Sequence, residues 1–296
     1  MLNTSLQKLS SRPQLAMFFL LLMSLWLTGC AALPSDVQRP VTTALEDNLD
    51  TRLGKIVAAR AAAASTRNDS GFALVGNAEL AFTSRMTLIR AAEKTLDLQY
   101  YAVHADDTTD RLLDALREAA ARGVRVRILL DDFNTAGKDA QVLRLAFEKN
   151  IDMRLFNPLP SNRSSATWRI ISSLSDAARL QRRMHNKIFV ADNAVAITGG
   201  RNLGDTYFGQ SDGVNFVDID VLAAGRIARD LSRSFDQYWN NPLAYPVQSL
   251  MTVNDLERLK PPAAAQTANF GENRPTRGRP GSVATCLTKR LTWTAL

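Results

Sequence analysis

Hydrophobic and polar residues follow two alternating periods between Gly76 and Trp239. Apolar residues three and four apart are typical of helices, and short apolar runs bounded by turn residues are typical of strands. The pattern predicts helices over 77–94, 107–122, 136–149, 165–180, 202–208 and 225–239, and strands over 96–103, 124–130, 152–156, 187–192, 194–198 and 217–223. Strands that alternate with helices favour an α/β fold with a largely parallel or mixed sheet flanked by helices.

The two ends of the chain differ from this regular part, which we take as a domain over 70–255. Residues 30–69 are polar and alanine-rich, and we expect a tether with a helix over 41–64 that spaces the domain from a membrane or packs on its surface. Residues 256–296 have no sustained period beyond Pro261 and are rich in proline, glycine and arginine. We expect a disordered tail there, either natural or the product of a reading frame lost near residue 260.

The first 29 residues are typical of an export signal. Lys8 and Arg12 precede an apolar run over 15–26, which is short for a membrane span of about 20 residues. The run ends in Leu-Thr-Gly-Cys, which resembles the lipobox of bacterial lipoproteins. That resemblance implies lipidation of Cys30, and Ala31 after it implies transfer to the outer membrane. An uncleaved signal anchor with an incidental cysteine is the alternative. With Cys30 lipidated, only Cys286 is left and no intramolecular disulfide is expected.

The net charge of +7 and the pI of about 9.7 invite a nucleic-acid partner, so the position of the charge matters. Two positive charges precede residue 13. Beyond Lys260 there are five basic residues and one acidic residue, Glu272, which together contribute +4. The remaining net charge over 13–260 is therefore +1. A nearly neutral domain argues against nucleic acid as a partner.

A histidine and a lysine stand two positions apart in MHNKIFVAD, residues 184–192. If residues 187–192 form a strand, His185 and Lys187 share one side, because side chains alternate along a strand. A lysine ammonium can bind phosphate oxygens, and a neutral histidine, with an unperturbed pKa of about 6.5, can attack phosphorus. The pair predicts cleavage of a phosphodiester through a covalent phosphohistidine.

The second predicted strand of this region leads into Gly199, Gly200, Arg201 and Asn202. Glycines let the backbone approach a phosphate closely, and the Asn202 amide can donate to a phosphate oxygen without adding charge. We therefore expect these residues to bind the same anion as Lys187.

Several carboxylates could support the histidine, which needs a partner to fix its tautomer. Asp218 and Asp220 lie on one face of a predicted strand and are the candidates for that role. Asp192 falls in a turn, where backbone N–H groups commonly bond to its carboxylate. Asp131 and Asp132 end another predicted strand. A functional site at that strand end and a turn or helix cap at Asn134 explain these two acidic residues equally well.

HNKIFVAD followed by GGRN resembles the HxKxxxxD signature of the phospholipase D (PLD) superfamily. The resemblance extends over 76–250, through LDLQYYAV, RGVRVRILLDD, RRMHNK, GGRNLGD and FDQYWN, and is closest to the cardiolipin-synthase-like branch. It implies a PLD-like half-domain, no cofactor and no metal. The residues that it implies for catalysis are the nucleophile His185, the phosphate ligands Lys187 and Asn202, the signature residue Asp192 and the histidine-orienting Asp218.

The chain departs from the family in having one such motif, whereas full-length members carry two and use the second histidine as general acid. The other histidine, His104, has no lysine two positions later. General acid catalysis contributes about 10²–10⁴-fold, so one motif is an incomplete site. A homodimer would restore the second motif, and loss of a second half near residue 260 is the other explanation.

The sequence therefore predicts a lipid-anchored phosphatidyltransferase of cardiolipin synthase type. Its expected partners are membrane phospholipids, phosphatidylglycerol with or without phosphatidylethanolamine, in the bacterial cell envelope at the periplasmic face of the outer membrane. The alternatives are a homodimeric phosphodiesterase or nuclease of the same superfamily and a catalytically silent, truncated lipoprotein.

Overall fold

The computed structural model of the protein describes residues 33–64, 70–132, 137–159, 182–258 and 292–293. Three predicted features lie outside these residues: the signal segment with Cys30, the helix over 165–180 and most of the tail.

The described strands form one mixed sheet in the order β8-β4-β3-β2-β5-β6-β7-β1-β9. Strands β2, β3 and β4 are parallel, and the other pairings in the sheet are antiparallel. The strand bounds are β1 (Ser70–Val75), β2 (Thr95–Tyr100), β3 (Arg125–Asp131), β4 (Ile151–Phe156), β5 (Ile188–Ala191), β6 (Val195–Gly199), β7 (Asp220–Gly225), β8 (Ala244–Pro246) and β9 (Thr292–Trp293). The prediction of an α/β fold with a mixed sheet is confirmed.

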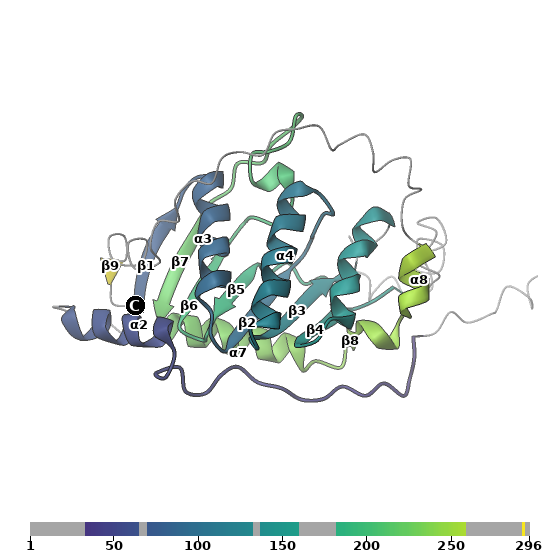
Figure 1. The fold of residues 1–296 in the computed structure, drawn as a ribbon, viewed down its shortest axis with the longest axis horizontal. Coiled ribbons are helices and arrows are strands. Elements are labelled where there is room, and N and C mark those ends of the chain that lie inside the picture. The colour runs from purple at the N-terminus through teal and green to yellow at the C-terminus, as the bar shows by residue number, and fades with distance from the viewer. Residues whose placement is uncertain (1–32, 65–69, 133–136, 160–181, 259–291, 294–296) are drawn as a thin grey trace, which may run out of the picture. The chain divides into compact units, whose positions relative to one another are not determined.

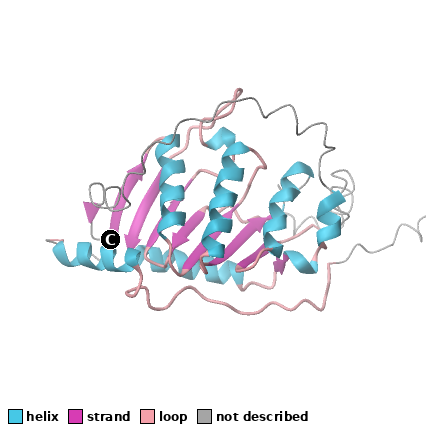
Figure 2. Cartoon of the chain, in the orientation of Figure 1, coloured by secondary structure: helices cyan, strands magenta, loops and turns pink. Residues whose placement is uncertain are grey.

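Helices cover both faces of this sheet (Figure 2). Helices α3 and α4 lie on the face toward the viewer in Figure 1, and α7 lies behind the sheet. The helix bounds are α2 (Arg52–Ala63), α3 (Ala78–Ala91), α4 (Asp107–Ala121), α7 (Arg226–Trp239) and α8 (Val253–Arg258), with 3₁₀ turns η2 (Gly137–Phe147), η4 (Asp205–Tyr207) and η5 (Val247–Ser249).

Strand β5 shows how the alternation of side chains builds two cores. Phe189 and Ala191 join the large cluster that includes apolar residues of α3 and α4. Ile188 and Val190 point the other way and pack with Ala228 of α7. A strand buried on both faces is apolar at every position, which explains the continuous IFVA run.

The helices begin and end where local chemistry predicts. The Asn77 side chain accepts a hydrogen bond from Leu80 N at 2.8 Å, and the Asp106 side chain accepts one from Thr109 N at 3.1 Å. Both are N-caps, which satisfy backbone donors that have no partner inside the helix. Gly123 follows α4 with a φ of +97°, a left-handed conformation that glycine adopts without strain.

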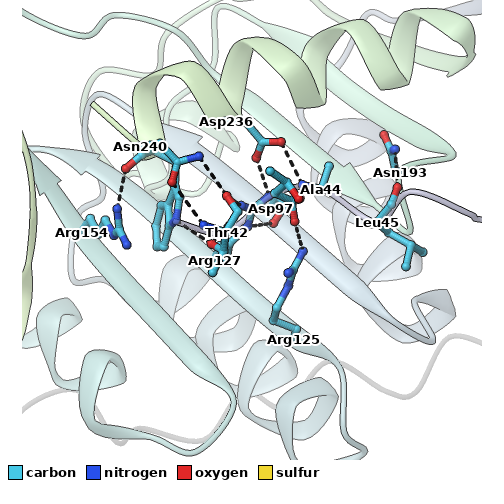
Figure 3. Close-up of polar contacts among 12 residues, drawn as sticks. Thr42, Ala44, Leu45, Asp97, Arg125, Arg127, Arg154, Asn193, Asp236 and Asn240 are labelled. Carbon is cyan, nitrogen blue, oxygen red and sulfur yellow. Dashed lines mark hydrogen bonds and ion pairs between the residues drawn. The ribbon is translucent and has the colours of Figure 1, made fainter. Parts of the chain in front are cut away.

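The predicted helix over 41–64 is wrong in its first half, because only α2 is helical. Residues 40–48 form instead an extended N-terminal strap bound to α7 and to strands β3 and β4 (Figure 3). Thr42 O accepts a bond from Arg127 Nη1 at 2.9 Å, and Ala44 N donates to Asp236 Oδ2 at 2.8 Å. These long-range bonds occupy backbone groups that a helix would have paired internally.

Two other differences concern strands. The strand predicted over 217–223 begins only at Asp220, and residues 214–219 before it have no regular structure. Strands β1, β8 and β9 were not predicted, since they are short or lie outside the periodic region, and their partners are distant in sequence.

Candidate active site

The candidate site lies where four strands meet at one end of the sheet. The register pairs Gln99 of β2 with Ile188 of β5, and Gly199 of β6 with Asp220 of β7. Because β5 is antiparallel to both β2 and β6, its first residue lies beside their last residues. The same end of the sheet therefore holds four residues at or beside these strand ends: Tyr101, Lys187, Gly200 and Asp220.

His185 and Lys187 lie just before β5, so the predicted strand alternation is not what brings them together. The Lys187 Nζ lies 2.9 Å from His185 Nδ1 and 3.2 Å from Nε2, and it also donates to His185 O at 2.7 Å. The Lys187 ammonium therefore contacts the His185 ring at both of its nitrogens. His185 is exposed to solvent, whereas Lys187 is 5% exposed.

Burial changes the chemistry of Lys187. Desolvation of the ammonium lowers the pKa of Lys187 below the ordinary 10.5, and the negative charge of Asp218 opposes this shift. A desolvated cation interacts more strongly with an anion than a hydrated one. Lys187 is therefore suited to bind a phosphate oxygen.

Tyr101 forms one wall beside this pair. Its ring centroid lies 4.7 Å from that of His185, with the planes inclined by 49°. The Lys187 Nζ lies 5.5 Å from the Tyr101 centroid, within the range of a cation–π contact. The sequence pattern identified Tyr101 only as part of an apolar run.

Asp131 holds the chain that leads into His185. Its Oδ2 accepts a bond from Met184 N at 2.9 Å, and its Oδ1 lies 3.2 Å from Arg183 Nη1. Met184 is fully buried among the residues under α7. Asp131 is thus a positioning residue, and its place at the end of a strand was the sequence signal for it. Its neighbour Asp132 instead accepts a bond from Leu159 N at 2.7 Å.

Gly199 and Gly200 make room for carboxylates. A Cβ on Gly199 would come closer than 3.0 Å to Asp220 Oδ1, and one on Gly200 would come equally close to Asp218 Oδ1. In this structure the space that we expected a phosphate to use is filled by these two side chains.

Asp220 lies at the centre of a buried charge cluster behind the glycines. Its Oδ2 lies 3.0 Å from Arg85 Nη1 and 3.5 Å from Arg201 Nη1, and all three side chains are at most 3% exposed. Arg85 Nε also donates to Tyr100 OH at 3.1 Å. Burial raises the pKa of Tyr100, although the charge of Arg85 lowers it, so this phenol stays neutral. Two guanidinium groups face one carboxylate, which leaves one positive charge beside the site.

Asn202 is held in one orientation by two bonds. Its Oδ1 accepts from Ala102 N at 3.1 Å, and its Nδ2 donates to Tyr207 OH at 3.0 Å. Tyr207 stacks on Phe216 at 4.9 Å and lies parallel to His104 at 6.4 Å between centroids. One Nδ2 hydrogen of Asn202 is left for an incoming anion.

Asp192 is not beside His185. It follows β5 at the opposite end from Lys187, about 16 Å away at roughly 3.3 Å per strand residue. Its carboxylate accepts bonds from Glu93 N, Lys94 N and Thr95 N at 2.8–3.2 Å. It therefore anchors the start of β2, as expected for an acid in a turn, and does not face the reacting groups.

Asp218 lies near the pair without bonding to the histidine. It precedes β7, is half-buried, and its carboxylate rests against Gly200. Among the described residues, no hydrogen bond joins Asp218 to either ring nitrogen of His185, and both nitrogens lie within reach of Lys187. The bond expected of a histidine-orienting acid is thus not formed in this structure.

The described part of the chain contains no group of three or more His, Cys, Asp or Glu side chains placed to hold a metal ion. It also contains no helix that is both long and apolar enough to span a membrane.

A family model described as "Cardiolipin synthase, PLD-like domain" matches residues 86–239, just over half of the chain. The chain belongs to this family. His185, Lys187, Asn202 and Asp218 all fall inside the matched span of this cardiolipin synthase, PLD-like domain.

Relatives and solved structures give further comparisons. The chain is 44% identical over 188 residues to cardiolipin synthase C of Escherichia coli K12, which covers 62% of this chain and 39% of that protein. It is 33% identical over 240 residues to an uncharacterized protein of Helicobacter pylori 26695, covering 81% of this chain and 47% of the other. The chain thus spans less than half the length of these relatives.

Two solved structures are similar at low identity. NucT from Helicobacter pylori has a TM-score of 0.44 and 14% identity, and the match covers 60% of this chain and 98% of NucT. The phosphatidylserine synthase of Haemophilus influenzae has a TM-score of 0.42 and 13% identity, with 64% of this chain and 42% of that chain covered. Family membership rests on the sequence match and not on these two structures.

Proposed function

We propose that this chain is a phosphatidyltransferase of the cardiolipin synthase type, acting on membrane phospholipids through a phosphohistidine at His185. The observation that carries the proposal is the contact of Lys187 Nζ with the His185 ring, 2.9 Å from Nδ1. The pair lies at the same end of the sheet as Asn202, whose Nδ2 carries a second hydrogen besides the one donated to Tyr207 OH, and this supports a shared phosphate site. Family membership supports the same reaction class.

The reaction has two halves. A ring nitrogen of His185 attacks the phosphorus of a phospholipid, so that a P–N bond forms and the P–O bond to the headgroup alcohol breaks. The leaving oxygen takes up a proton from a general acid. The hydroxyl group of a second phospholipid then attacks phosphorus, loses its proton to a base, and breaks the P–N bond to regenerate His185.

Substitution of His185 tests this proposal. A chain starting at Ala31 and its His185→Ala variant are incubated with phosphatidylglycerol, with and without phosphatidylethanolamine, and the products are read by mass spectrometry. We expect cardiolipin from the parent and none from the variant, and the mixture that works identifies the phosphatidyl donor. Equal turnover by both proteins would exclude the phosphohistidine.

A homodimeric phosphodiesterase is the second candidate, because the described site contains one motif and the leaving group needs a proton. A second copy could supply its own His185 as general acid. Such an enzyme would hydrolyse simple phosphodiesters or nucleic acid. The nearly neutral domain argues against nucleic acid as the substrate. The absence of nuclease activity at every protein concentration tested would exclude a homodimeric nuclease.

We also propose that Cys30 is lipidated and holds the domain at the periplasmic face of the outer membrane of a bacterial envelope. The lipobox-like LTGC run supports this. Labelling of the expressed full chain with a radioactive fatty acid, lost in Cys30→Ser, is the expected result. Retained labelling in that variant would contradict it.

A further inference from the structure

An exposed apolar loop leads into β7. Within residues 213–219, which we name the apolar loop, four side chains are exposed: Val214 by 75%, Phe216 by 53%, Val217 by 98% and Ile219 by 56%. The chain between η4 and β7 rises beyond the ends of α3 and α4 at the top of Figure 1. Contiguous exposed apolar side chains are typical of a surface that contacts a membrane or a partner.

The apolar loop is attached to the active site. Phe216 N donates to Thr206 O at 2.8 Å, and the Phe216 ring stacks on Tyr207, whose hydroxyl accepts the Asn202 bond. At its other end, the Asp218 carboxylate rests against Gly200. The loop therefore forms part of the rim around the phosphate ligands.

The turn before the loop is ordered by its own bonds. Ser211 N donates to Asn215 Oδ1 at 3.1 Å, and Asn215 Nδ2 donates to Ser211 O at 2.9 Å. Val214 is thus presented on a closed turn, and Phe216 directly after it is held by its bond to Thr206 O, which lowers the entropy lost when these side chains bind.

The charge of the loop limits its partner. Within 213–219 the only charged residue is Asp218, which is half-buried and faces Gly200, and the exposed Asp212 stands directly before the loop. The outward surface of the loop therefore carries valine, phenylalanine and isoleucine, with one negative charge beside them. Such a surface has no attraction for the phosphates of nucleic acid. It has instead the composition of side chains that enter the boundary between lipid headgroups and acyl chains.

We propose that the apolar loop inserts into the surface of a phospholipid bilayer and so brings lipid phosphates to His185. This inference rests on the proposed phospholipid substrate. The substrate phosphate is covalently joined to acyl chains that stay in the bilayer, so the rim of the site must touch the headgroup layer during reaction. The apolar loop is the described part of that rim that carries exposed apolar side chains.

The tether between Cys30 and Arg39 sets how far the domain can reach from a lipid anchor. The Arg39 guanidinium lies 4.1 Å from the Tyr245 ring centroid, and Tyr245 pairs with Leu155, the residue before the last of β4. The chain therefore leaves the sheet at its β8 edge, and five strands lie between β8 and β7. Nine residues lead from Cys30 to Arg39, and they span up to about 30 Å when extended.

Vesicle binding tests the inference without turnover. The parent is the chain starting at Ala31 with His185→Ala, mixed with vesicles of phosphatidylglycerol and phosphatidylethanolamine and sedimented. The loop variant adds Val214→Ser and Val217→Ser. The matched control adds Val41→Ser and Leu49→Ser, two apolar residues that are 77% and 59% exposed away from the loop.

We expect the loop variant to bind vesicles about tenfold more weakly than the parent, because two valines no longer leave water. The control should bind as the parent does. Absence of binding by the parent, or equal binding by parent and loop variant, would overturn the inference. Thermal unfolding of each protein confirms that it is folded.

Two further outcomes separate this inference from its alternatives. If the parent sediments as a dimer and the loop variant as a monomer with undiminished vesicle binding, the loop contacts a second copy and the inference is wrong. If vesicles bind through the loop while the active His185 chain makes no phospholipid product, the inference holds and the proposed transferase activity fails.

Discussion

Lys187 and Asp192 belong to one short motif, yet their side chains act at opposite ends of β5. Lys187 contacts the His185 ring, and its burial lowers its pKa. Asp192 collects three backbone N–H groups at the start of β2. One motif thus contains a group suited to chemistry and a group that places the strand next to it.

The lowered pKa of Lys187 predicts a pH effect. Since its charged form is disfavoured, Lys187 loses its proton below pH 10.5, and phosphate binding weakens as the pH rises through that pKa. Arginine stays protonated over this range, so in Lys187→Arg the alkaline fall of kcat/KM should move to higher pH, although overall activity drops because the geometry differs. The measurement is the pH profile of both proteins, with Lys94→Arg on the surface as control. An identical alkaline limb in parent and Lys187→Arg would rule Lys187 out as its origin.

Gly200 gives a second prediction at this scale. In Gly200→Ala the new Cβ displaces the Asp218 carboxylate, and we expect kcat/KM to fall about tenfold or more, since small displacements of a site are costly. Gly76→Ala is the matched control, because nothing lies within 4 Å of its new Cβ. Steady-state kinetics on phospholipid vesicles compare the two variants. Equal effects of both would show that the contact between Asp218 and Gly200 has no role in activity.

The N-terminal strap is the element whose role changed most between sequence and structure. Its carbonyl oxygens accept hydrogen bonds from buried side chains of the domain (Figure 3). Arg127 donates to Thr42 O, Arg154 Nη2 donates to Pro40 O at 2.6 Å, and Asn193 Nδ2 donates to Leu45 O at 2.7 Å. Desolvation also lowers the pKa of Arg154 to about 10. The strap is therefore part of the folded domain.

Truncation of the strap should destabilise the protein. A chain starting at Asp50 leaves several buried donors and acceptors without partners, at about 1–3 kcal/mol each, so we expect a loss of at least about 3 kcal/mol in the free energy of unfolding. A chain starting at Arg39 keeps these bonds and serves as control. Urea unfolding followed by circular dichroism measures both. Equal midpoints would mean that the strap contributes nothing to stability.

At the scale of the whole molecule, the described site holds the proposed nucleophile His185 and the proposed anion ligands, but only one HxK pair. His104 lies near Asn202, because its ring is parallel to that of Tyr207 and its backbone N donates to Leu203 O at 2.9 Å. In the proposed reaction a second HxK motif would donate the proton to the leaving group. The described site has no second motif to do this.

A second copy that supplies this proton makes activity depend on concentration. We expect turnover per chain to fall when the protein is diluted below the dimer dissociation constant at a fixed lipid concentration. Sedimentation velocity over the same range gives the fraction of dimer for comparison. Constant turnover per chain from a monomer would refute the requirement for a second copy.

Local chemistry in the sequence was enough to predict most of the elements. The helices predicted over 77–94 and 107–122 begin at side-chain caps, Asn77 and Asp106, and the apolar run before Asp131 predicted a strand. These signals act between residues a few positions apart, so they do not depend on the rest of the chain. The HxK interval lets His185 and Lys187 meet in an extended segment but not on a helix, and here they meet in the segment before β5.

Only the tertiary structure decided which groups meet across long separations. The partners of the Asp192 carboxylate are 97–99 positions away, and those of the strap are up to 198 positions away. Such bonds override weak local propensity, which is why residues 41–50 are not helical. Strand β7 starts late, at Asp220. Because β7 starts late, residues 213–219 form the apolar loop, and Asp218 and Asp220 lie against Gly200 and Gly199. Their positions depend on how β6, β7 and the turn around Tyr207 pack together.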